Sequence, residues 1–231
     1  DTALLQCLQS LPQQLPTSPK AILMISAHWE STQGEFLLQA NPKPSMYYDY
    51  YNFPAHTYEV VYPAPGQPEL AQQVVDLIQN AGGQARLDHE RGFDHGAFVP
   101  AYVIYPDAQI PMVQLSIDNS YDPAMHIELG HALRPLREEG VLILGSGASY
   151  HNLRLLGPEG AAPSEAFDAW LEHALVQSTS YEQRMQQIEQ WEFAPAARIA
   201  HAREDHLVPL FTALGASEPN DPVTRILSSG S

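Results

Sequence analysis

The sequence has little cysteine and little positive charge. Its single cysteine, Cys7, excludes a framework of intramolecular disulfides and is typical of a reducing compartment, so we expect a cytoplasmic protein. Eleven lysine and arginine residues face 27 aspartate and glutamate residues, which gives a formal net charge of −16. A chain this acidic disfavours nucleic acid and anionic membrane surfaces as partners, and we expect neither.

Long apolar runs and targeting signals are also lacking. The sequence has no run of about 18 apolar residues, so it predicts no membrane span, and no secretory signal is recognisable. What the chain does have is a composition of 44% hydrophobic and 16% charged residues over 231 residues. This composition is sufficient for a sizeable core, and the length fits one large domain over residues 1–231.

Apolar strand-like runs alternate with amphipathic, helix-like segments along the chain. Strands are predicted at residues 20–27, 85–87, 112–117 and 141–144. Helices are predicted at residues 3–14, 68–81, 123–138, 164–177, 181–191 and 205–214, with a shorter helix that stops at Pro106 and with Gly215 ending the last one. The alternation predicts an α/β fold of three layers, with a central, mostly parallel or mixed sheet and helices on both faces.

Residues 41–67 are dense in tyrosine and proline and predict a long loop. Loops of this length inside a compact domain are usually functional. Tyr51 and the other tyrosines of residues 47–51 suit an aromatic-lined entrance to a site for an aromatic or apolar substrate. A packed surface loop is the alternative, and the residues alone favour neither.

Three histidines lie next to apolar segments. His28 directly follows the first predicted strand, His151 follows the fourth, and His206 opens the last apolar segment. Ligands gather at the carboxyl ends of strands in an α/β sheet, and imidazole both binds transition metals and titrates near neutral pH. These histidines are therefore a candidate metal site with an acid–base partner. The alternatives are a buried core histidine at position 28 and an ordinary helix N-terminus at position 206, with Glu204 as a rival metal ligand.

His95 lies in the sequence GFDHG at residues 92–96. Glycines on both sides predict a loop whose backbone approaches another group closely, whereas the alternative is a tight turn in which Asp94 caps the following helix. Asn152 is expected to orient the imidazole of His151, and His56 is expected on the surface or the wall of the site. The remaining histidines are expected to be solvated; they are His89, His126, His131, His173 and His201.

Nucleophilic hydrolysis and phosphate binding have weak support. The GSG at residues 145–147 is one residue too short for the G-x-S-x-G elbow of serine hydrolases. It also lacks the P-loop lysine and the third glycine of the dinucleotide fingerprint. Cys7 has no histidine nearby in sequence, so a thiol nucleophile is not expected.

Several ordered blocks resemble a known family. They are SAHWE at 26–30, YDYYNFP at 48–54, YPAPGQPELA at 62–71, RGFDHGAFVP at 91–100, IPMVQLSID at 110–118, EGVLILGSGASYHNLR at 139–154 and REDHLVPLF at 203–211. Together they resemble the LigB-type class III extradiol ring-cleavage dioxygenases, and most of all their single-domain branch, the 4,5-DOPA-extradiol-dioxygenase-like proteins. The resemblance covers most of the chain.

The resemblance implies a mononuclear non-haem Fe(II) enzyme, with Zn(II) also found at such sites. It implies cleavage of a small catecholic substrate with O₂ to a muconic semialdehyde-type product. His28 and His206 match metal ligands, and the branch's preference for histidine favours His206 over Glu204. His151 matches the histidine beside the metal, which has an acid–base role and is sometimes counted as a ligand. His95 matches a histidine on the substrate side, where Asp94 and Tyr51 are expected to join it.

The family carries a further ligand histidine in an HG(G/S)-type motif before the region that this sequence covers. We therefore expect residues 1–231 to be a single catalytic domain that lacks the N-terminal strand with that ligand, and part of its C-terminus. The sequence is compatible with a homo-oligomer. Two other functions stay open: a zinc-dependent hydrolase on the same scaffold, and a non-catalytic relative that binds a ligand or partner.

Overall fold

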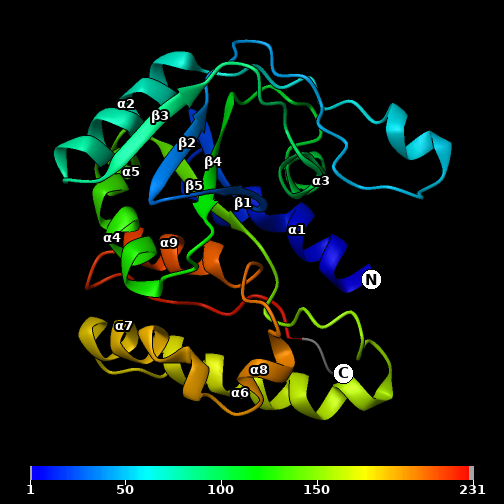
Figure 1. Ribbon diagram of the computed structural model, residues 1–231, viewed down its shortest axis with the longest axis vertical. Coiled ribbons are helices and arrows are strands. Elements are labelled where there is room, and N and C mark those ends of the chain that lie inside the picture. Colours follow the sequence, from blue (N-terminus) through cyan, green and yellow to red (C-terminus); the bar gives the residue numbers. More distant parts are fainter. Residues whose placement is uncertain (1, 229–231) are drawn as a thin grey trace.

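A mixed five-stranded sheet forms the centre of the computed structural model, which describes residues 2–228 (Figure 1). The strand order is β3-β2-β4-β1-β5. The strands are β1 (Ala21–Ser31), β2 (Glu35–Gln39), β3 (Gln84–Asp88), β4 (Met112–Asp118) and β5 (Val141–Ser146). β1 runs parallel to β4 and β5, and β2 runs parallel to β3 but antiparallel to β4. The predicted three-layer α/β fold is confirmed.

Helices cover both faces of this sheet (Figure 1). The described helices are α1 (Thr2–Gln14), α2 (Pro68–Asn80), α3 (His95–Ile104), α4 (Pro123–Leu133), α5 (Pro135–Glu138), α6 (Ala161–Leu175), α7 (Tyr181–Glu189), α8 (Ala197–Ala200) and α9 (Val208–Ala216). Short 3₁₀ turns lie at η1 (Ala55–Glu59), η2 (Pro158–Gly160) and η3 (Trp191–Phe193). Helices α2, α4 and α9 pack on one face, whereas α3 packs on the other. None of the described helices is long and apolar enough to cross a membrane.

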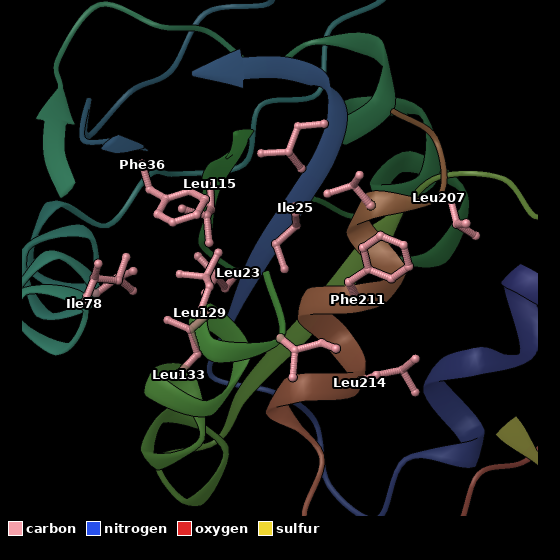
Figure 2. Packing of buried hydrophobic residues seen from close by; sticks show 14 of the residues in the cluster. Leu23, Ile25, Phe36, Ile78, Leu115, Leu129, Leu133, Leu207, Phe211 and Leu214 are labelled. Carbon is pink, nitrogen blue, oxygen red and sulfur yellow. The ribbon is translucent and has the colours of Figure 1, made fainter. Parts of the chain in front are cut away.

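β1 is apolar on both faces because it lies between two neighbouring strands and two helical layers. Leu23 and Ile25 point into the larger core with residues of α2, α4 and α9 (Figure 2). Ile22 and Met24 point the opposite way, into a smaller core against α3. This alternation is the two-residue period of a strand, and burial on both sides explains why the segment reads as a continuous apolar run.

The larger core depends on a close crossing of α4 and α9. A Cβ atom added to Gly130 of α4 would lie 2.6 Å from the backbone nitrogen of Ala216, and one added to Gly215 of α9 would lie 2.9 Å from the Cα of Ile127. Gly215 was expected to end the last helix, and that prediction is wrong. It lies inside α9, where the absence of a side chain lets the two backbones approach.

Other segments also differ from the sequence prediction. β2 was not expected, because five residues between polar segments give too short an apolar pattern to identify a strand. The helix expected over residues 123–138 is divided into α4 and α5, since Pro135 cannot continue the hydrogen bonding of the first helix. The last helix begins at Val208, so His206 lies in the turn that precedes it.

Candidate active site

Four imidazoles from four separate segments meet at the carboxyl ends of β1 and β5. The rings of His28 and His95 lie 4.0 Å apart between centroids, and those of His28 and His206 lie 5.0 Å apart. His151 stacks on His206 at 3.5 Å with nearly parallel ring planes. The structure thus brings together all four histidines that the sequence selected, in the order 95, 28, 206 and 151.

A break in the strand register positions His28. β1 pairs regularly with β4 up to Ile25, opposite Leu115, but the next pair joins Glu30 to Ile117. β1 therefore advances five residues where β4 advances two. Such bulges redirect side chains at the end of a strand and are frequent at active sites. His28 lies within this bulged stretch, at the edge where α3 and the turn before α9 also arrive.

The close backbone approach predicted around His95 occurs at Gly96. A Cβ atom there would lie 2.8 Å from Cδ2 of His28, 3.2 Å from Oδ1 of Asp94 and closer still to the hydroxyl of Ser26. The helix-capping alternative also holds, since Asp94 accepts a hydrogen bond from the backbone nitrogen of Ala97 at 3.1 Å. The close backbone approach and the helix cap are therefore two features of the same tight corner, where the start of α3 meets β1.

Asp94 is fully buried beneath the histidines. Its carboxylate accepts hydrogen bonds from Ser26 Oγ at 2.8 Å, from the side chain of Gln114 and from Arg91 at 3.0 Å. Ser26 in turn accepts a hydrogen bond from the backbone nitrogen of His28 at 3.1 Å. Asp94 therefore holds the first turn of α3 against β1. The substrate contact expected for it stays a prediction.

Asp49, in the tyrosine-rich loop, is the site residue that the sequence reasoning missed. Its Oδ1 lies 2.6 Å from Nδ1 of His95 and accepts a hydrogen bond from the backbone nitrogen of His95 at 3.0 Å, and its Oδ2 lies 3.5 Å from Nδ1 of His28. Burial alone would raise the pKa of Asp49, but the bonds from His95 outweigh it and the pKa is lowered. The pKa of His95 is raised, chiefly by the hydrogen bond to Asp49.

The other two histidines of the cluster, His151 and His206, are held by hydrogen bonds of their backbones. Ala148 donates a backbone hydrogen bond to the carbonyl of His206 at 2.9 Å, and His151 donates one to the carbonyl of Ala200 at 2.9 Å. Asp205 lies 3.3 Å from Nδ1 of His206. Burial lowers the pKa of His151, and its neighbour His206 lowers it further. The imidazole of His151 is therefore kept neutral and able to accept a proton near pH 7.

Several sequence expectations about individual residues change here. Asn152 was expected to orient the imidazole of His151, but its side chain donates to the backbone carbonyl of Ile199 at 2.7 Å. Glu204, the rival metal ligand, is bonded to Arg198 at 2.6 Å. His56 is exposed, as expected. Tyr51 is 79% exposed.

The tyrosine nearest the cluster is Tyr50. Its ring meets the ring of His95 edge-on at 5.6 Å. Within residues 2–228 no hydrogen bond or ring contact joins Tyr51 to the cluster, so its role in binding substrate stays a prediction. A one-residue step along an extended segment reverses the direction of the side chain, and composition does not say which tyrosine faces inward.

Two of the histidines expected to be solvated are fully buried, so that prediction is wrong for His126 and His201. His126 accepts a hydrogen bond from the backbone nitrogen of Asp118 at 3.0 Å and bonds the carbonyl of Asp122 at 2.7 Å. His201 bonds the carbonyl of Ser149 at 2.8 Å, and burial lowers its pKa to about 4. Both act as neutral, structural hydrogen-bonding groups.

The donor set suits a divalent transition metal. Two groups of metal-ligating side chains have their ligand atoms within 4.8 Å of one another: His28 with Asp49 and His95, and His151 with Asp205 and His206. Imidazole nitrogen and carboxylate oxygen are the donors of non-haem iron and of catalytic zinc sites.

Comparison with known proteins agrees with this arrangement. Residues 5–229 match the family model described as the catalytic LigB subunit of aromatic ring-opening dioxygenase. The chain belongs to the LigB family. A 4,5-DOPA dioxygenase extradiol from Beta vulgaris is 43% identical over 217 residues, covering 91% of this chain and 78% of the relative. A protein of the same name from Escherichia coli K12 is 37% identical over 221 residues, covering 94% and 79%.

A solved structure also matches this LigB chain. The crystal structure of an uncharacterized protein from Escherichia coli K12 superposes with a TM-score of 0.75 at 34% identity, covering 96% of this chain and 85% of the other. The expected family and its ring-cleaving class of enzyme are confirmed, and so is the fold.

Proposed function

We propose that this LigB-family chain cleaves a catecholic substrate with O₂ at a mononuclear non-haem iron site, to give a muconic semialdehyde-type product. The observation that carries the proposal is the convergence of His28, His95, His151 and His206 at one edge of the sheet. The names of its relatives, 4,5-DOPA dioxygenase extradiol, support the class of reaction.

His28 and His206 are the proposed protein ligands of the metal. They come from the bulged end of β1 and from the turn before α9, and their rings already lie 5.0 Å apart. When bound there, iron would supply the Lewis-acid and redox chemistry that a reaction between a catechol and O₂ needs. Zinc fits the same donors but has no redox chemistry, so iron is the ion we assign.

His151 is the proposed proton-transfer residue. Its lowered pKa, caused by burial and by His206, keeps its imidazole neutral near pH 7 and able to accept a proton from a catechol hydroxyl. Proton return to the product oxygen uses the same ring. His95, on the far side of His28, is the second proposed polar contact of the substrate, and Tyr51 and Asp94 remain the further substrate contacts expected from the sequence.

The substrate is proposed to enter through the cavity beside His151. This cavity has a volume of about 690 Å³, the size of a small-ligand site. Arg154 also lines it, and within residues 2–228 its guanidinium is bonded to no carboxylate. The neighbouring Arg203, by contrast, is already paired with Glu30. We therefore propose that Arg154 receives an acidic substituent of the catechol.

The test is ring cleavage by full-length protein loaded anaerobically with Fe(II), followed by O₂ uptake and by the absorbance of the semialdehyde product. We expect His151→Ala to keep its iron and to lose about 10²-fold or more in kcat, the usual contribution of general acid–base catalysis. His173→Ala, an exposed histidine of α6, is the control. Unchanged turnover in His151→Ala would remove its proposed role, and activity with Zn(II) without O₂ would favour the hydrolase.

A further inference from the structure

We propose that Asp49 is a positioning residue of the ring-cleavage site: its carboxylate fixes the orientation and tautomer of His95. This inference rests on the proposed function. The observation behind it is that one carboxylate oxygen meets the same residue twice, at the ring Nδ1 of His95 (2.6 Å) and at its backbone nitrogen (3.0 Å). Two contacts to one residue hold both its backbone and its ring.

The tautomer of His95 follows from these contacts. A carboxylate accepts hydrogen bonds, so the ring nitrogen that faces Asp49 carries the proton. The opposite nitrogen, Nε2, makes no hydrogen bond to any residue in the described part of the chain. In the neutral form of His95 the lone pair therefore lies at Nε2, on the edge of the ring turned away from Asp49. In a histidine–carboxylate pair of this kind, the carboxylate sets which nitrogen does chemistry.

Asp49 also faces a second imidazole. Its other oxygen lies 3.5 Å from Nδ1 of His28, whose ring is 4.0 Å from that of His95. The side chain of Asp49 is only 10% exposed, so its charge is poorly screened by water. Asp49 is therefore close to both imidazoles, but of the two only His95 is hydrogen-bonded to it.

The loop that carries Asp49 is fixed on both sides of it. Tyr47 donates a backbone hydrogen bond to Phe93 at 2.7 Å, directly beside the corner that leads into α3. Arg91 lies over the ring of Tyr47 at 4.2 Å. After Asp49, the hydroxyl of Tyr50 bonds the carbonyl of Thr57 within the loop. Because of these contacts, the tyrosine-rich segment holds a carboxylate against the histidines.

A different role for Asp49 is direct metal ligation with His28 and His95, since the ligand atoms of all three lie within 4.8 Å of one another. The two roles predict different losses. A ligand contributes to metal affinity, whereas a positioning residue contributes to turnover through His95 and leaves the metal in place.

Four variants of full-length protein separate these roles: Asp49→Asn, His95→Ala, the double variant, and Glu59→Gln as a control from the same loop, where Glu59 is exposed. We expect Asp49→Asn to lower kcat about 10²-fold, with KM and the dissociation constant of Fe(II) changed less than threefold. In the double variant, Asp49→Asn should add less than threefold to the loss caused by His95→Ala, because the carboxylate acts through that ring.

Three results would overturn the proposal: full activity in Asp49→Asn, a large loss of iron affinity, or multiplicative losses in the double variant. A readout independent of turnover is the ¹⁵N NMR spectrum of the histidine rings. It should show His95 protonated at Nδ1 in the parent protein and not in Asp49→Asn. If the parent cleaves no catechol, the proposed function fails, and the NMR result alone decides whether Asp49 sets the tautomer.

Discussion

Replacing Gly96 with alanine tests whether the corner between β1 and α3 sets the position of His28. The added Cβ would lie 2.8 Å from Cδ2 of His28 and 3.2 Å from Oδ1 of Asp94, whereas carbon atoms in contact need about 3.5–4.0 Å. Ser26, which is closer still, is fully buried and bonded to Asp94 at 2.8 Å, so it has little freedom to retreat. The imidazole of His28 is the group most able to move, by roughly 1 Å.

The substitution is expected to lower the rate of the reaction while the protein stays folded. Overpacking costs about 1–3 kcal/mol. Gly96 lies in the first turn of α3, where the preference of a helix interior for alanine offsets little of this cost, so the free energy of unfolding falls by about 1–3 kcal/mol. A displacement of about 1 Å at a reacting centre costs about 10²-fold in rate. We therefore expect Gly96→Ala to remain folded, with kcat/KM lowered about 10²-fold.

The assay pairs urea unfolding with steady-state ring cleavage and measurement of bound iron. The control is Gly83→Ala, whose Cβ would lie 2.8 Å from the Cγ2 of Ile78, a similar crowding away from the site. It should lose a comparable free energy of unfolding and keep its activity. If Gly96→Ala cleaves catechols like the parent, the argument that this corner positions His28 is wrong.

Two further predictions concern residues near the histidines. Below pH 6.5 the protein should lose stability, because protonation of the buried His201 is unfavourable. Burial lowers the pKa of His201 to about 4, and its bond to Ser149 opposes this; His151, His206 and Asp205 are the ionisable groups near it. Between pH 6.5 and 4 the unfolded chain binds a proton at His201 that the folded protein does not, so the free energy of unfolding falls by up to roughly 3 kcal/mol across that range. Urea unfolding at several pH values should show this fall, and His201→Gln should make the free energy of unfolding depend less on pH. Arg154→Gln should raise the KM for a catechol that carries a carboxylate about tenfold and leave the KM for a neutral catechol such as 4-methylcatechol unchanged. Arg86→Gln, outside the cavity, is the charge-matched control. Equal changes in KM for both substrates would argue against the proposed contact.

The sequence was informative where one local pattern decides the structure. β1 reads as a continuous apolar run because helices bury both of its faces. β4 is buried throughout although Gln114 and Ser116 interrupt its apolar residues, and β5, at the end of the strand order, is only partly buried. Histidines at the ends of β1 and β5 could be selected because strand ends gather ligands. These histidines could be selected together with His95 and His206 even though the strand register and some of the helices were not predicted correctly.

The sequence was less informative where contacts between distant segments determine the position of a side chain. Asp49 and His95 are 46 residues apart, and only the path of the loop places the carboxylate on the ring. His201 lies in a polar stretch of sequence, yet it is buried against the rings of Phe167 and Trp191. Neither contact has a local sequence signal, since both depend on how segments far apart in the chain pack together.

The cluster is supported in two different ways, and for His28 and His151 this difference fits the roles proposed for them. His28 and His95 rest on a buried network of side chains around Asp94, in which Ser26 is also fully buried. His151 is held by a backbone hydrogen bond to Ala200 in a loop that lines an open cavity. A metal ligand benefits from a rigid mount, because its geometry must not change through the reaction. A residue that accepts and returns protons benefits from a position that substrate and solvent can reach, which is where the fold places His151.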